Sequence, residues 1–172
     1  MTPLQNTRVA NDVDGWLEVV TFDLGGETFA IEALMVQEIL DLLPETPVPG
    51  APAFAPAVAN FRGKVIPIAD LRVAFGMPAA ASTIDSRIMV IEIGVDGEAL
   101  LIGLRTDKVY EVAQLRLCDG ESPPSVGMSW RPDFIRSLVE RDGQFLVLPD
   151  LGQIFEHMGR AGARPALAGA RR

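Results

Sequence analysis

The stretch NFRGKVIPIADL, residues 60–71, places a basic turn between two apolar flanks and predicts a β-hairpin. Gly63 can adopt the positive φ that a tight turn requires, and Arg62 beside it lies at the hairpin tip. The return strand ends at Asp70, whose carboxylate can cap a short helix over residues 71–75. The stretch therefore predicts a hairpin followed directly by one helical turn.

Two features of this hairpin carry further expectations. Pro67 has no backbone N–H, so we expect its strand to lie at a sheet edge or to contain a bulge. Arg62 stands in a strongly acidic chain, where its planar guanidinium can hold a carboxylate of the same molecule. A solvated hairpin tip with no partner is the alternative for the same residue.

Alternation of apolar and polar residues predicts more strands on both sides of the hairpin. The segment WLEVVTFDL at residues 16–24 alternates, GGE supplies a turn, and Phe29 and Ile31 resume the alternation. Further strands are predicted at residues 87–94, 97–107, 108–117 and 134–149, the last with a turn at Asp142-Gly143 and a short helix after it. Nine or ten short strands are typical of an all-β barrel or sandwich.

The segment IEALMVQEILDLL, residues 31–43, fits two structures. Ile31, Leu34, Met35, Ile39 and Leu42 recur at helical spacing, so the pattern by itself favours a helix. The same residues contain a run that could form one face of a strand. Three prolines and a glycine end the segment in either case.

Charge and composition exclude several classes of function. The chain has 172 residues, 48% of them apolar, and a net charge of −8. Without residues 1–15 and 159–172 the body carries 10 basic and 21 acidic groups, which disfavours binding to nucleic acid or to an anionic membrane. No run approaches 18 apolar residues and no signal peptide is recognisable, so we expect a cytoplasmic protein with no direct membrane insertion. Both ends, 1–15 and 158–172, are predicted to be flexible tails.

Residues for catalysis, cofactors or metals are sparse. His157 is the only histidine, and no G-x-S-x-G elbow accompanies it. Cys118 is the only cysteine, so no intrachain disulfide and no zinc cluster can form. The sequence predicts no enzyme, no cofactor and no metal. The long segment 119–133 leaves open a small-ligand-binding or enzymatic β-barrel.

Five segments together resemble the CheW-like family, the coupling proteins of bacterial chemosensory arrays. They are VQEIL at 36–40, NFRGKVIPIADLR at 60–72, DKVYEV at 107–112, FDLGGETFAI at 22–31 and TPVPGAPAFAPAV at 46–58. The most specific is the Arg-Gly turn followed by an apolar run, a proline and Asp-Leu-Arg. The resemblance extends from about Val20 to Phe155.

The resemblance implies an all-β fold of two small five-stranded SH3-like barrels on a shared apolar core, with short helical turns and a short C-terminal helix. The domain would span residues 16–157. We expect one barrel at roughly 22–67, and the other at 16–21 plus 68–157. The resemblance also implies a strand at 36–42 after one helical turn, in place of the helix that the pattern favours.

The resemblance implies a non-enzymatic adaptor that couples the cytoplasmic tip of chemoreceptors to the regulatory domain of a CheA-type histidine kinase. Rings with other CheW-like domains are a further implication, as is recruitment of a cytoplasmic protein to membrane-associated receptor arrays. The same fold could instead serve a non-flagellar pathway, such as pilus motility or second-messenger control. Surfaces, rather than a reactive group, would carry this function.

Seven residues are expected at the partner-binding surfaces. By the resemblance, Glu38 and Arg62 pair beside Gly63 and stiffen the contact surface. Val36 and Ile39 would contact the kinase domain, although a core position is an equal alternative for Ile39. Arg87 and Ile88 would lie on a strand that faces the receptor. Asp70 is assigned to capping its helix rather than to binding.

Overall fold

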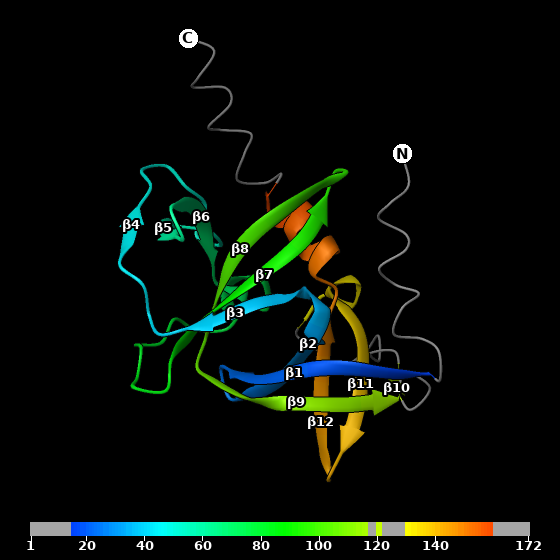
Figure 1. Ribbon diagram of the computed structural model, residues 1–172. Coiled ribbons are helices and arrows are strands. Elements are labelled where there is room, and N and C mark those ends of the chain that lie inside the picture. The colour runs from blue at the N-terminus through cyan, green and yellow to red at the C-terminus, as the bar shows by residue number, and fades with distance from the viewer. Residues whose placement is uncertain (1–14, 117–119, 122–129, 160–172) are drawn as a thin grey trace.

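The computed structural model describes residues 15–116, 120–121 and 130–159, which form strands with a few short helices (Figure 1). The strands are β1 (Trp16–Leu24), β2 (Glu27–Glu32), β3 (Val36–Leu40), β4 (Glu45–Pro47), β5 (Ala57–Phe61), β6 (Lys64–Ala69), β7 (Arg87–Val95), β8 (Glu98–Thr106), β9 (Lys108–Arg116), β10 (Gly120–Glu121), β11 (Ile135–Arg141) and β12 (Gln144–Pro149). The helices are the 3-10 turns η2 (Ala33–Met35) and η4 (Pro132–Phe134), α1 (Leu71–Ala74) and a C-terminal helix at 151–159. No helix in these ranges is long and apolar enough to cross a bilayer.

The strands form two sheets of six. Sheet one has the order β10-β11-β12-β2-β1-β9, and sheet two has the order β3-β7-β8-β6-β5-β4. The chain passes from sheet one to sheet two through η2, and it returns at Asp107, the single residue between β8 and β9. The all-β fold class with two SH3-like barrels and a short C-terminal helix is confirmed. The short strands β4 and β10 raise each sheet from the expected five strands to six.

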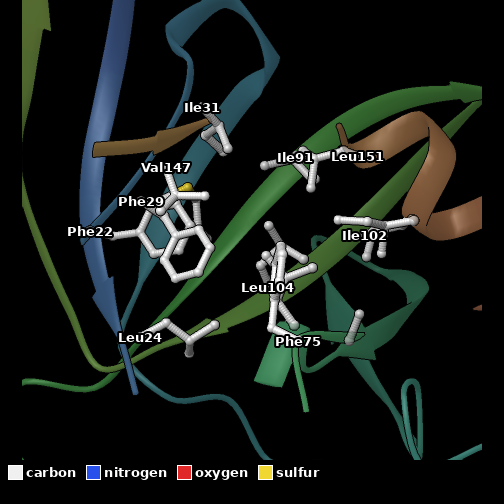
Figure 2. Packing of buried hydrophobic residues seen from close by; sticks show 14 of the residues in the cluster. Phe22, Leu24, Phe29, Ile31, Phe75, Ile91, Ile102, Leu104, Val147 and Leu151 are labelled. Carbon is white, nitrogen blue, oxygen red and sulfur yellow. The ribbon is translucent and has the colours of Figure 1, made fainter. Parts of the chain in front are cut away.

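Apolar side chains form three clusters because several strands are buried on both faces. On β1, Leu17 and Val19 point into a cluster within sheet one, while Val20, Phe22 and Leu24 point the other way. The second set joins residues of sheet two, such as Ile91 and Leu104, in a core shared by both sheets (Figure 2). A third cluster lies within sheet two. The predicted shared core is therefore present, with a barrel interior on each side of it.

Four hairpin turns have positive φ at both central residues, as two-residue type I′ turns require. They are Gly25-Gly26, Arg62-Gly63, Asp96-Gly97 and Asp142-Gly143. Glycine and aspartate are usual at the first of these positions, and arginine is not. The Arg62-Gly63 turn therefore departs from the other three in sequence while it shares their geometry.

The helix that the pattern favours over residues 31–43 is wrong. Only η2 is helical there, and β3 pairs with β7 from Val36↔Ile91 to Leu40↔Ile88. The backbone of β7 needs hydrogen-bond partners on that side, and this long-range pairing outweighs the local helical spacing. The resemblance was the better guide to this segment.

The expected division between the barrels also needs correction. Residues 16–32 and 108–149 contribute the strands of sheet one, whereas residues 36–106 contribute those of sheet two. The first hairpin belongs with the last strands because β1 pairs with β9 and β2 pairs with β12. These pairings join residues distant in sequence, which period-two alternation cannot reveal.

The expectations for the opening hairpin have mixed outcomes. The hairpin is present as β5 and β6, and the Asp70 carboxylate accepts from the Arg72 backbone N–H at 3.0 Å, which confirms the helix cap. The edge position predicted from Pro67 is wrong, because β6 is an interior strand. The ladder from β6 to β8 holds only Ile68 and Ala69, so Pro67 lies outside it. The predicted tails fall outside the described residues, apart from 15 and from 158–159, which continue the C-terminal helix.

Candidate functional site

The hairpin tip and the edge strand of sheet two meet in an ion pair. The Arg62 guanidinium Nη2 lies 2.6 Å from Oε2 of Glu38, and the contact lacks the angles of a directed hydrogen bond. The Arg62 guanidinium also lies over the Phe61 ring, with its carbon 5.1 Å from the ring centroid. Below the tip, the Asn60 side-chain carbonyl accepts the Gly63 backbone N–H at 2.9 Å. The structure thus places the two charged residues together, as the resemblance implied.

The pair also shows how sheet two is curved. Glu38 lies on β3, at one edge of the sheet, and Arg62 directly follows β5, the strand next to the other edge. These strands can touch only if the sheet curls until its two edges approach each other. The Glu38–Arg62 contact therefore spans the gap between the edges of the barrel.

Stability does not explain the presence of arginine at this turn. The Arg62 side chain is 73% exposed, and an ion pair so open to water contributes about 0–1 kcal/mol. Arg62 has a φ of 52°, and a non-glycine residue in the left-handed region costs about 1 kcal/mol or more. The two contributions roughly cancel, so the geometry of the guanidinium at the surface is the feature that this residue supplies.

Ile39 and Val36, the other two residues expected on β3, face solvent and the shared core respectively. Ile39 is 43% exposed and faces solvent, so the core alternative for it is wrong. Val36 is half-buried and packs against the shared core. Leu42, just beyond β3, and Val65, beside the hairpin tip, are 45% and 66% exposed. Apolar side chains thus accompany the ion pair on sheet two.

The two residues expected on the receptor-facing strand have different surroundings. Arg87 is half-buried, lies 3.4 Å from the Asp41 carboxylate and donates to the Ile84 carbonyl at 2.8 Å. Ile88 is only 1% exposed and lies in the interior cluster of sheet two, so the chain by itself does not present this side chain to a partner. Adjacent residues of a strand point to opposite faces, and only one face of β7 at this end reaches the surface.

A groove of about 500 Å³ lies where the two sheets meet at η2. Its walls come from both sheets, with Glu32 and Arg136 of sheet one joined by an ion pair of 2.5 Å, and Glu92 and Ile93 of sheet two across from them. Leu34 of η2 is 52% exposed at this groove. None of the residues that line this groove was expected at a partner-binding surface from the sequence. Leu34 is exposed where the chain passes from sheet one to sheet two, but the helical spacing of residues 31–43 gave no reason to single it out.

Polar side chains elsewhere in the described ranges form ion pairs and hydrogen bonds. Within the described ranges no three His, Cys, Asp or Glu side chains gather as metal ligands. His157 is exposed and its Nε2 lies 2.6 Å from the Arg131 guanidinium, which also lowers the pKa of Asp133 by hydrogen bonding to it. Cys118 and most of segment 119–133 lie outside the described residues. The arrangement that the structure shows is one of ion pairs, apolar edges and a groove.

The pKa of Tyr110 supplies a direct check on the structure of sheet one. Its hydroxyl donates to the Asp23 carboxylate at 2.5 Å, which raises the pKa above the ordinary value of 10.0. Because the protonated phenol is favoured in the folded state, this contact stabilises the fold below the ordinary pKa and is lost as pH rises through the raised one. Tyr110 is the only tyrosine, so phenolate absorbance during alkaline titration reports it alone.

We expect Asp23→Asn to return the Tyr110 pKa toward the ordinary value, with Glu18→Gln as the control for loss of an exposed carboxylate on the same strand. Equal titration of the wild-type protein and Asp23→Asn would contradict the contact.

The fold and the site define a class of protein: a double-barrel β scaffold with an ion pair, exposed apolar side chains and a groove at its surface. The CheW-like domain model matches residues 18–158. The chain belongs to the CheW-like family. It is thus a chemotaxis coupling adaptor, a scaffold that connects chemoreceptors to the kinase CheA, as the resemblance implied.

Relatives and a solved structure agree over most of the chain. The chemotaxis protein CheW of Rhizobium meliloti is 29% identical over 150 residues, covering 87% of this chain and 94% of the relative. The CheW of Treponema pallidum is 28% identical over 153 residues, covering 88% and 90%. The crystal structure of the scaffolding protein TtCheW from Thermoanaerobacter tengcongensis superimposes with a TM-score of 0.72 and 29% identity, covering 81% of this chain and 88% of that one.

Proposed function

We propose that this adaptor binds the regulatory domain of a CheA-type kinase through the surface around β3 and the Arg62-Gly63 turn. The Glu38–Arg62 pair carries the proposal, because an arginine is held at a strained turn position where it adds little stability. Exposed Ile39 and the half-buried Val36 supply apolar contact on the same strand. Apolar residues rimmed by charge are the usual composition of such interfaces.

The groove between the sheets is the proposed site for the receptor tip. A groove with apolar walls can receive the apolar side of a helix. Leu34, Met35 and Ile93 supply apolar surface, while Arg136 and Glu32 supply charge at the wall. Arg87, on the β7 strand that also lines the groove, adds a charged contact at the other end of the strand.

No step of this function needs a bond to be made or broken, so we assign the protein no enzymatic activity. Its work is to hold two partners in a fixed relation, and its specificity depends on charged contacts such as the Glu38–Arg62 pair. We place it in the cytoplasm, recruited to receptor arrays and able to join rings with other CheW-like domains.

Arg62→Ala is expected to weaken binding to the kinase regulatory domain by about tenfold or more, as for an interface arginine of hot-spot strength. Arg62→Asn tests the same point without strain, because Asn-Gly is the preferred type I′ turn. We expect Arg62→Asn to raise the free energy of unfolding by about 0.5–1 kcal/mol and still to lose binding. Calorimetric titration with the kinase domain of the same genome, together with urea denaturation, measures both effects.

A charge swap separates direct pairing from two independent contacts. Glu38→Arg combined with Arg62→Glu should recover part of the binding that each single change loses, giving a measurable coupling in the double-mutant cycle. Arg131→Ala removes an exposed arginine near the C-terminal helix and serves as the matched control. Undiminished binding by both Arg62 variants would refute the proposed role of this surface.

A further inference from the structure

Among the residues that the structure describes, one arginine is buried, and it lies where the two sheets are joined. Arg72, in the first turn of α1, is 5% exposed. Its Nη1 lies 3.3 Å from the Asp70 carboxylate, and its Nη2 donates to the carboxylate of Asp107. Its Nε has no hydrogen-bond partner in the described part of the chain. A charge held this deep needs its partners, because removing one leaves the other uncompensated.

Asp107 is the residue at which the chain crosses between the sheets. It stands alone between β8 of sheet two and β9 of sheet one. Its backbone N–H donates to the Asp23 carbonyl at 2.9 Å, and its second carboxylate oxygen accepts the Gly25 N–H at 2.8 Å. Asp107 is therefore attached to the β1–β2 hairpin of sheet one on one side and to Arg72 on the other.

Arg72 is attached in turn to sheet two. It follows β6 through the Asp70 cap, and the Asp70 carboxylate has a second arginine, Arg105 of β8, at 3.9 Å. Arg105 makes a bidentate contact to Glu45 of β4 at 3.1 and 2.8 Å. A chain of alternating charges thus runs from the edge of sheet two to the first hairpin of sheet one, and Arg72–Asp107 is the step that crosses between the sheets.

The rest of the contact between the sheets is less directional. The shared core is apolar, and hydrophobic contact sets closeness rather than angle. Charge-assisted hydrogen bonds from a planar guanidinium constrain both distance and angle. A buried ion pair adds little net stability compared with an apolar replacement, so its orienting effect is the contribution that it can make.

We propose that Arg72 and Asp107 are positioning residues that set the angle between the two barrels. The groove is built from both sheets and contains none of the residues of this charge chain, so its width depends on that angle without direct contact. The surface around β3 and Arg62 lies within sheet two alone and does not depend on it. The link to receptor binding rests on the proposed function, whereas the barrel angle does not.

The experiment measures a distance between the two sheets, which changes when the angle between the barrels changes. Spin labels at Glu98→Cys on β8 and Glu140→Cys on β11, both exposed and on different sheets, report their separation in a Cys118→Ala background. We expect a narrow distance distribution for the parent, and a shifted or broadened one for Asp107→Asn and for Arg72→Lys. Asp107→Asn is nearly isosteric, so it keeps the shape of the crossing while removing the charge.

Glu45→Gln is the matched control, because it breaks the outer end of the charge chain and leaves Arg72–Asp107 in place. Its distance distribution should equal that of the parent. We expect Asp107→Asn to weaken binding of a receptor cytoplasmic fragment by roughly three- to tenfold, with kinase-domain binding unchanged.

An unchanged distance distribution in folded Asp107→Asn and Asp107→Glu would overturn the inference, whatever the binding results. If Asp107→Asn does not fold, the rate of hydrogen exchange at the Gly25 amide is compared between the parent and Arg72→Lys. We expect a faster rate in Arg72→Lys, because loss of the Arg72–Asp107 contact should loosen the Asp107 carboxylate that accepts this amide. If the Arg62 variants bound the kinase domain as tightly as the parent, that result would contradict the proposed function alone and not the inference about the barrel angle.

Discussion

Replacing Phe29 by Ala is expected to lower the free energy of unfolding by about 3–5 kcal/mol. Phe29 is fully buried on β2, in the core shared by the two sheets (Figure 2). Its ring centroid lies 5.7 Å from that of Phe22, 5.2 Å from Phe75 and 6.1 Å from Trp130. These neighbours come from β1, from the end of α1 and from the segment before η4, so one cavity would loosen three parts of the molecule.

Urea denaturation followed by tryptophan fluorescence measures this change, since Trp130 lies beside the altered site. Phe145→Ala is the matched control, because Phe145 is 53% exposed on β12 and its loss should alter stability by about 0.5 kcal/mol or less. Equal destabilisation by the two substitutions would show that the shared core does not hold the sheets together as described. A loss of stability in Phe29→Ala that Phe145→Ala does not share would support this role of the shared core.

Ile88→Ala is expected to lower the free energy of unfolding by about 2–5 kcal/mol. Ile88 is 1% exposed, within the cluster of sheet two that includes Phe61 and Ile66. The packing there is close, because a Cβ added at Gly103 would lie 3.0 Å from Cγ2 of Ile88. Little rearrangement could fill the space left by a lost side chain, which places the expected cost well above that of a surface change.

This prediction also decides between the two readings of Ile88. Arg87→Ala is the control from the same strand, since its ion pair to Asp41 is open to water and contributes about 0–1 kcal/mol. If Ile88→Ala left the denaturation midpoint unchanged and reduced receptor binding, that result would support the surface role expected from the resemblance. A large loss of stability in Ile88→Ala, with Arg87→Ala near the parent, fits the interior position.

Local chemistry predicted the hairpins well. The turns at Asp142-Gly143 and Arg62-Gly63 were expected from short-range signals, and both have the positive φ values that those signals require. The Asp70 cap follows from the same kind of rule, because a carboxylate at this position satisfies a backbone N–H of the next turn. These features depend on a few adjacent residues, so no distant contact can easily override them.

The candidate site was predicted only in part. The resemblance brought Glu38 and Arg62 together, and their contact is present. It did not show that Ile88 lies in the barrel interior, because residue order does not say which face of β7 points inward. The groove at η2 and the Arg72–Asp107 pair were not predicted, since their residues meet only after the two sheets have assembled.

The sequence by itself determined the all-β class, the positions of the turns and the capped helix, because each rests on alternation or on backbone preferences within a few residues. Only the tertiary structure decided that the first hairpin joins the last strands and that a buried arginine lies at the crossing between sheets. Those outcomes depend on pairing and burial between residues far apart in the chain, and the free energy of such contacts exceeds local propensity.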